Sequence, residues 1–187
     1  MVERILSDYD HAYGLRSVAF RYFNAAGADP QGRTGERHEP ETHLIPLTLR
    51  AALGSDERLR VFGDDYETAD GSGVRDYVHV SDLASAHVLG LGYLESGGDS
   101  NVFNLGSGKG CSVFEVLNAA RKITGRAIPV EIAPRRAGDP PVLYACADKA
   151  IRTLGWKPQY QDVELMIAHA WGWHQRESYA CHPIKDV

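Results

Sequence analysis

A single arginine lies between an acidic, glycine-rich loop and an apolar stretch in the segment Gly63 to Ala84. The segment reads GDDYETADGSGVRDYVHVSDLA, and Arg75 stands where the loop becomes a predicted strand. A guanidinium group presents a planar set of donors that matches phosphate oxygens, and it keeps its charge. Arg75 therefore suits an anionic ligand such as a phosphate group. The alternative is an ion pair with Asp76 or another surface carboxylate, and the residue types leave both open.

Two further segments could contribute polar groups to the same ligand. The segment APRRAGD, from Ala133 to Asp139, offers a second arginine that could share a diphosphate with Arg75, and a carboxylate that could accept sugar hydroxyls. Asn24 follows an apolar stretch and can both donate and accept. The alternatives are a solvated charged turn for the first segment and an asparagine bonded to its own turn for the second.

Other motifs that could carry chemistry have simpler interpretations. The run GSGKG, from Gly106 to Gly110, precedes a helix but lacks the spacing of a dinucleotide fingerprint or a P-loop, so we interpret it as a βα turn. On the last predicted helix, we expect the tryptophans at 171 and 173 to pack in the core and the histidines at 169 and 174 to be exposed. The sequence shows no nucleophile elbow and no HExxH motif.

Bulk properties limit the kinds of partner. The chain has 187 residues and 43% hydrophobic content, which indicates a globular protein. Its net charge is -5, and acidic and basic residues are interspersed, so no basic patch indicates binding of nucleic acid. No apolar run reaches the length of a signal sequence or a membrane span, so we place the protein in the cytoplasm, away from membranes. Cys111, Cys146 and Cys181 are odd in number, far apart in sequence and without the paired spacing of metal ligands. This favours reduced thiols and predicts no metal site.

Helical and strand patterns alternate along the chain, which predicts an α/β fold. A capping box, Ser112 with Glu115, marks one helix start, Ser81 or Asp82 marks another, and Gly14 is a helix stop. The periodicity predicts helices over residues 2–13, 44–53, 82–94, 113–123, 148–154 and 163–175, and strands over 17–23, 59–62, 74–80, 101–105 and 128–132.

Six segments together resemble the UDP-glucose 4-epimerases of the extended short-chain dehydrogenase/reductase group. They are, in order, RYFNAAGADPQG, ETHLIP, VFGDDYETADGSGVRDYVHVSDLA, NLGSGKGCSVFEV, APRRAGD and LGW. The resemblance implies an isomerase that binds NAD and interconverts UDP-glucose and UDP-galactose through a 4-keto intermediate. It also implies an incomplete doubly wound, Rossmann-like sheet with a small α/β substrate-binding domain. Residues 1–27 would end the nucleotide-binding domain, and 28–187 would form the substrate domain, with 74–105 returning to the sheet.

The resemblance assigns ligand-binding positions but no catalytic ones. The family's Tyr-x-x-x-Lys pair and glycine-rich dinucleotide turn do not occur here, and Met1 to Glu3 resembles the text that follows that pair. The chain thus resembles the C-terminal portion of the family. Tyr22 and Phe23 would line the nicotinamide end of NAD. The residues that would hold the UDP-sugar are Asn24, His43, Leu44, Val61, Phe62, Arg75, Arg136 and Asp139, with Leu143 beside the sugar C2 substituent; His43 replaces the asparagine of many relatives.

These implications define a main hypothesis and its rivals. We expect a UDP-sugar-binding portion that is inactive alone, exposes apolar surface where parallel strands lack cover, and associates with itself, in a family whose members form homodimers. The alternatives are a non-catalytic UDP-sugar binding module or a gene remnant. Within the enzymes, the alternative is an epimerase for UDP-N-acetylhexosamine or UDP-pentose.

Overall fold

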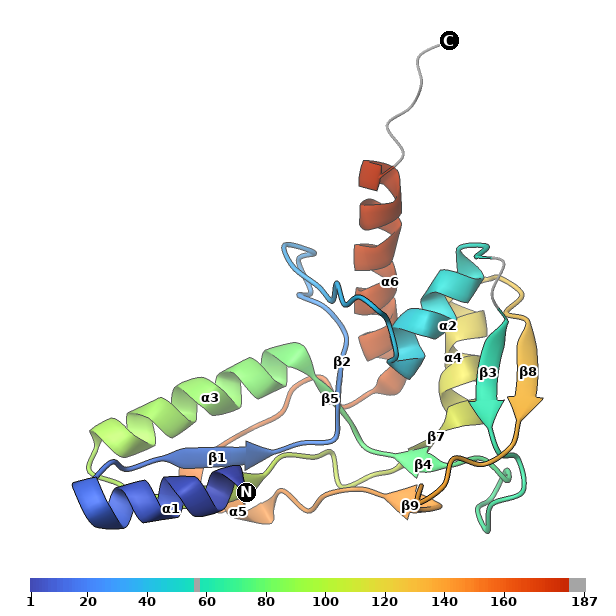
Figure 1. Cartoon of the computed structure of the whole chain (residues 1–187). Helices are drawn as coiled ribbons and strands as arrows, with labels where there is room; N and C mark the ends of the chain where they lie inside the picture. The colour runs from blue at the N-terminus through green and yellow to red at the C-terminus, as the bar shows by residue number, and fades with distance from the viewer. Residues whose placement is uncertain (56–57, 182–187) are drawn as a thin grey trace.

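The strands form short, mainly parallel pairs joined through helices. The computed structural model describes residues 1–55 and 58–181 (Figure 1). Three parallel pairs join β1 (Val18–Arg21) to β6 (Asn101–Asn104), β2 (Asn24–Ala26) to β5 (Tyr77–His79) and β3 (Leu59–Phe62) to β8 (Val130–Ala133). In a fourth sheet, β4 (Val74–Arg75) lies between β7 (Cys111–Ser112), antiparallel to it, and β9 (Val142–Leu143), parallel to it. Parallel pairs need long crossovers, which helices supply here.

One packed unit, the helical region, consists of the helices α2 (Leu44–Ala52), α4 (Val113–Thr124) and α6 (Val163–Cys181). Their apolar faces meet around Leu49, Leu117 and Ile167, which are at most 2% exposed. The capping box predicted from Ser112 and Glu115 is present at the start of α4, so that prediction is confirmed. Because all three helices bury a face against one another, this region has a closed core.

The second packed unit, the strand region, consists of β1, β6, α3 (Val80–Glu95) and α5 (Asp148–Leu154). Phe103 and Trp156 are almost fully buried there, and the Trp156 indole Nε1 donates to the Asp82 carbonyl at 2.9 Å. Figure 1 shows α1 (Val2–Tyr13), α3 and β1 on the left, α2, α4, β3 and β8 on the right, and β2 with β5 between them. The link between the two regions therefore runs through β2 and β5.

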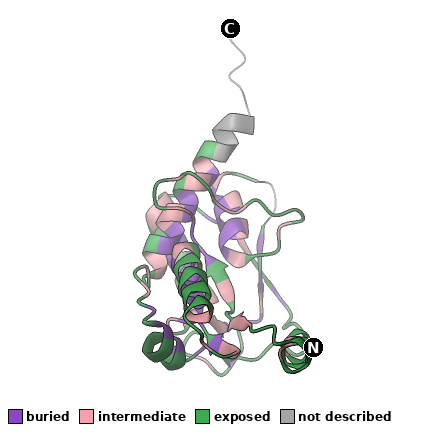
Figure 2. Ribbon diagram, turned by 90° about the vertical axis from the view of Figure 1, so that its left-hand side faces the viewer, coloured by how far each residue is buried: buried purple, intermediate pink, exposed green. Residues whose placement is uncertain are grey.

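The helix α1 has an apolar face that nothing covers. It has no buried residue, and Val2, Ile5, Tyr9 and Tyr13 are between 48% and 77% exposed. Figure 2 shows this helix, beside the N label, in the colour of exposed residues. On α3, Val88 and other apolar side chains are exposed as well. Exposed apolar surface is thus present on the helices of this region, whereas the expectation concerned uncovered strands, and the residues of β1 and β6 are mostly half-buried.

The strand predicted over 74–80 is interrupted. It forms β4 and β5, and α3 already begins at Val80. The prediction that Ser81 or Asp82 caps this helix is wrong, because His79 is the N-cap and its ring accepts the Ser81 backbone N–H. The Asp82 carboxylate instead accepts the backbone N–H groups of residues 159 and 160, at 2.8 and 2.9 Å.

Two more expectations need correction. The strand predicted over 17–23 is β1, which ends at Arg21, and Asn24 begins β2 and does not follow a strand end. The prediction that His169 and His174 are exposed is wrong, since His169 is half-buried and His174 is 6% exposed on α6. Trp171 packs in the core as expected. Among the helices of the described part of the chain, none combines the length and apolar character needed to cross a membrane.

Candidate functional site

Arg75 and Asp139 meet although they are far apart in sequence. Arg75 Nη2 donates to Asp139 Oδ1 at 2.6 Å, and Nη1 donates to the Val74 carbonyl at 2.8 Å. The β4–β9 pairing sets Arg75 directly opposite Leu143. A guanidinium has five N–H donors, so these two contacts leave donors for a ligand. The Arg75 side chain is 16% exposed, which keeps it in one orientation at the surface of the fold.

Asp76 does not pair with Arg75. It is fully buried, and its carboxylate accepts the Ser107 N–H and hydroxyl, at 2.9 and 2.7 Å, and the Ala145 N–H at 3.1 Å. The Asp76 carbonyl also accepts the Asn24 side-chain N–H at 2.9 Å. Arg75 therefore does not pair with Asp76, but it does form an ion pair with another surface carboxylate, Asp139, as the alternative allowed. Asn24 bonds a distant segment and not its own turn.

Arg136 lies against an aromatic ring. Its guanidinium carbon is 3.9 Å from the centroid of Phe62, and Arg60 lies over the same ring at 5.4 Å. Its neighbour Arg135 is engaged elsewhere, since Nε donates to Asp65 Oδ1 at 2.7 Å. Phe62 and Arg136 line a cavity of about 590 Å³ that also contains the arginines at positions 50, 58 and 60. The cavity wall is thus rich in cations.

A second cavity, of about 490 Å³, lies beside the start of α2. Its lining includes five of the residues predicted to bind ligands: Tyr22, Phe23, Asn24, His43 and Leu44. Tyr22 and Phe23 are 43% and 41% exposed, so their rings are open to a ligand. Aromatic faces with a few polar groups are the usual lining of a small-molecule site.

The predicted residues therefore fall into three neighbouring groups. One lines the smaller cavity, one is Phe62 with Arg136 in the cation-rich cavity, and one is Arg75 with Asp139 and Leu143. The backbone links the last two groups, because the Asp139 N–H donates to the Arg136 carbonyl at 3.3 Å. Val61 stands apart, since its side chain is 2% exposed and packs in β3. Only its backbone could reach a ligand.

Sequence reasoning missed a buried histidine pair below the smaller cavity. His79 Nε2 lies 3.0 Å from His169 Nδ1, and His79 is fully buried. Burial, together with the charge of His169, lowers the pKa of His79, so its ring is neutral at pH 7. Gly27 has a positive φ, and a Cβ there would lie 2.6 Å from the His79 ring. The alternating pattern of Tyr77 and His79 was the available signal for an inward-facing histidine.

Two glycines of GSGKG serve packing. A Cβ on Gly106 would lie 2.5 Å from Asp76 Oδ2, and one on Gly110 would lie 2.2 Å from the Val74 side chain. The run connects β6 to β7 and α4, as expected of a βα turn. Packing therefore explains the glycines at 106 and 110, whereas nothing lies within 4 Å of a Cβ on Gly108, whose φ of 69° is left-handed.

Parallel strand pairs with crossover helices and ligand-sized cavities define an α/β protein of Rossmann-like fold. The structure of this chain is similar to that of a solved UDP-glucose 4-epimerase, with a TM-score of 0.91 and 54% sequence identity, over 95% of this chain and 54% of the other. A UDP-glucose 4-epimerase from Brucella ovis, solved in complex with NAD, matches with a TM-score of 0.88 and 50% identity, over 91% of this chain and 52% of the other. The chain belongs to the NAD dependent epimerase/dehydratase family, whose model matches residues 1–106.

Curated relatives agree with the solved structures. The UDP-glucose 4-epimerase of Halalkalibacterium halodurans is 54% identical over 178 residues, which are 95% of this chain and 53% of that protein. The chain thus spans about half the length of the curated relatives it matches.

Proposed function

We propose that this chain is the UDP-sugar-binding portion of a UDP-glucose 4-epimerase. The observation that carries the proposal is the meeting of Arg75 and Asp139, 64 positions apart, with donors of Arg75 left over at the surface. A partly buried arginine held by a carboxylate is a preorganised phosphate ligand, because its orientation is fixed before the ligand arrives. The similarity to UDP-glucose 4-epimerases supports UDP as the group that carries the phosphates.

Each group of residues takes a part of the ligand in this proposal. Arg75 and Arg136 bind the diphosphate, and Asp139 accepts hydroxyl groups. Phe62 and the backbone of Val61 lie beside the uridine. The residues of the smaller cavity, Asn24, His43 and Leu44, complete the UDP-sugar site, while Leu143 limits the size of the sugar C2 substituent.

NAD is part of the proposal through the family, and this chain supplies only a small part of its site. Tyr22 and Phe23 are proposed to line the nicotinamide end, where their exposed rings are available. The only glycine-rich run before a helix in the sequence, GSGKG, lacks the spacing of a dinucleotide fingerprint. The described residues alone therefore do not fit the whole cofactor.

We further propose that the isolated chain does not epimerise. No tyrosine in the sequence is followed by lysine four positions later, so the acid/base pair of the family is not in this chain. The proposed domain division assigns residues 1–27 to the nucleotide-binding domain and 28–187 to the substrate domain. Within the second range, residues 74–105 return to the nucleotide-binding sheet. The helix α5 also packs on the strand region. We place the chain in the cytoplasm and expect it to associate with itself.

Calorimetry with UDP tests the proposal. We expect saturable binding, and Arg75→Ala should weaken it about 10- to 100-fold, because a hydrogen bond to a charged group contributes about 1.5–3 kcal/mol. Arg135→Ala is the matched control, since it removes an arginine that already pairs with Asp65 at 2.7 Å. No heat with UDP would favour a gene remnant, and equal losses in both variants would contradict the assignment of Arg75.

The rival functions separate in further measurements. Binding of UDP without turnover of UDP-galactose, in the presence of NAD, fits both the main proposal and a non-catalytic module. Restored turnover on adding the family's nucleotide-binding portion as a separate chain would favour the epimerase. Steady turnover by this chain alone would refute the proposed inactivity. Profiling the restored enzyme with UDP-N-acetylhexosamine and UDP-pentose would settle the role of Leu143.

A further inference from the structure

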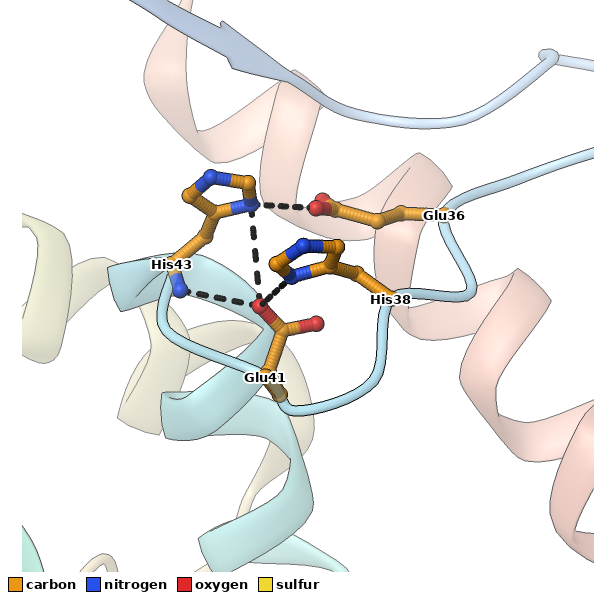
Figure 3. Close-up of side chains that lie close together, drawn as sticks. All are labelled: Glu36, His38, Glu41 and His43. Carbon is orange, nitrogen blue, oxygen red and sulfur yellow. Dashed lines mark hydrogen bonds and ion pairs between the residues drawn. The ribbon is translucent and has the colours of Figure 1, made fainter.

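Two histidines and two glutamates gather in the loop before α2. The possible ligand atoms of Glu36, His38, Glu41 and His43 all lie within 4.8 Å of one another. Figure 3 shows the four side chains close together, with dashed lines joining His43 to both carboxylates and His38 to Glu41. We call these four residues the histidine-glutamate cluster.

Two of the distances within the cluster are close to those of a metal site, and a third is that of a short hydrogen bond. His43 Nδ1 lies 2.5 Å from Glu36 Oε1, and the Nδ1 atoms of His43 and His38 each lie 3.6 Å from Glu41 Oε1. Four ligands about 2.0–2.2 Å from a tetrahedral zinc ion are about 3.4 Å apart. The two imidazole rings stack with centroids 5.1 Å apart and planes 16° apart, so both present the same nitrogen to one side. Small adjustments of exposed side chains would bring all four atoms to coordination distance.

Glu41 gives an independent reason to expect a cation. Its side chain is 1% exposed, and Oε1 accepts the backbone N–H groups of Thr42 and His43 at 2.8 and 2.9 Å. The other oxygen, Oε2, is buried without a hydrogen-bond partner, and Arg50 Nη2 is 4.0 Å away. The ion pair with Arg50 compensates the charge of Glu41 only at long range and leaves Oε2 without a hydrogen bond, so this carboxylate has capacity for a further ligand contact.

We propose that the histidine-glutamate cluster binds a divalent transition-metal ion such as Zn²⁺. Imidazole nitrogen with carboxylate oxygen is a ligand set for zinc, whereas Mg²⁺ and Ca²⁺ prefer oxygen ligands alone. Glu36 and His43 also line the smaller cavity, and Glu41 lines the cation-rich cavity. The metal would therefore lie between the two cavities. This inference does not depend on the identity of the ligand in either cavity.

The rival explanation is a set of ordinary histidine–carboxylate pairs that anchor the loop. Other contacts already hold it, since the Trp173 indole Nε1 donates to the Glu36 carbonyl at 3.1 Å and Arg50 pairs with Glu39 at 3.0 Å. These contacts lie outside the four ligand atoms, so they would persist when single ligands are replaced. The two explanations therefore differ in metal binding and not in folding.

Titration of the whole chain with Zn²⁺ alone, after treatment with a chelator, tests the proposal. We expect one ion bound per chain, not displaced by excess Mg²⁺, and a visible spectrum typical of four-coordinate Co²⁺ on substitution. His38→Ala should weaken binding at least about tenfold, as even loss of an outer-shell partner costs 10- to 100-fold. Its side chain is 47% exposed, so the variant should fold. Glu36→Gln provides a second variant that keeps the side-chain volume.

Two control variants remove metal-binding side chains elsewhere. His11→Ala lies on the exposed helix α1, and Cys146→Ser removes an exposed thiol. Both should bind Zn²⁺ as the unaltered chain does. The absence of saturable binding would overturn the proposal. So would unaltered affinity in both His38→Ala and Glu36→Gln, or loss of binding in either control variant.

Discussion

The helical region and the strand region use similar amphipathic helices but bury them differently. In the first, α2, α4 and α6 cover one another around Leu49 and Ile167. In the second, α1 has a clear apolar face and no buried residue, and α3 leaves Val88 72% exposed. An apolar face therefore predicts that a helix forms and which side of it can be buried. Whether that side is buried depends on neighbouring elements.

The same contrast applies to the candidate site. Phe62, Arg75 and Asp139 belong to short strands and turns beside the helical region, where cations and carboxylates hold one another. Tyr22 and Phe23 lie between the regions and are more than 40% exposed. We therefore expect the diphosphate part of the site to be better preorganised than the nicotinamide end.

The largest effect should come from the closed core. Leu49→Ala should lower the free energy of unfolding by about 2–5 kcal/mol, because Leu49 is fully buried and the cavity would not collapse completely. Leu91→Ala, on the exposed face of α3 with 59% exposure, should change it by less than about 0.5 kcal/mol. Urea unfolding measures both. Similar losses would show that the two regions do not differ in packing.

A buried carboxylate that bridges the segments around residues 107 and 145 should rank second. Asp76→Ala should cost about 1–3 kcal/mol or more, because the Ala145 N–H and the Ser107 N–H lose their acceptor. Asp8→Ala, on α1 with 59% side-chain exposure, is the control and should be near neutral. Hydrogen exchange should show faster exchange around residues 107 and 145 in Asp76→Ala. Unchanged protection there would refute the bridging role of Asp76.

The capping box should contribute a smaller amount. Ser112→Ala should lower the free energy of unfolding by about 1 kcal/mol, because the Glu115 N–H loses its side-chain acceptor. Ser96→Ala is the matched control at the end of α3, where the hydroxyl only donates to the Tyr93 carbonyl. Thermal or urea unfolding of both variants would separate the two serines. Equal losses would contradict a capping role specific to Ser112.

The smallest change in unfolding free energy should come from the open face of α1. Ile5→Ser with Tyr13→Ser should alter it by less than about 0.5 kcal/mol per site but reduce self-association, since both side chains are exposed. Sedimentation velocity over a concentration series measures the association. Arg4→Ser on the same helix is the control, with an 83% exposed side chain. Unchanged association in the double variant would indicate that another surface is responsible.

Predictions from the sequence were accurate where neighbours along the chain supply the contacts. The capping box needs only residues 112 and 115, and the end of α1 needs only Gly14, whose φ of 68° is left-handed. They were wrong where a distant element decides. His174 is buried by the packing of α6, and the Asp82 carboxylate accepts hydrogen bonds from the backbone N–H groups of residues 159 and 160. The histidine-glutamate cluster was not predicted, because its four side chains converge only through the fold of the loop before α2.

The sequence by itself determined the alternation of helices and strands, the apolar faces and the family resemblance, because these depend on local spacing and on the order of motifs. Only the tertiary structure decided that Arg75 pairs with Asp139 and not Asp76, that Gly106 and Gly110 pack against Asp76 and Val74, and that α1 has no buried residue. Those outcomes depend on contacts between residues far apart in the chain. Such contacts form only when the strands have paired and the helices have packed.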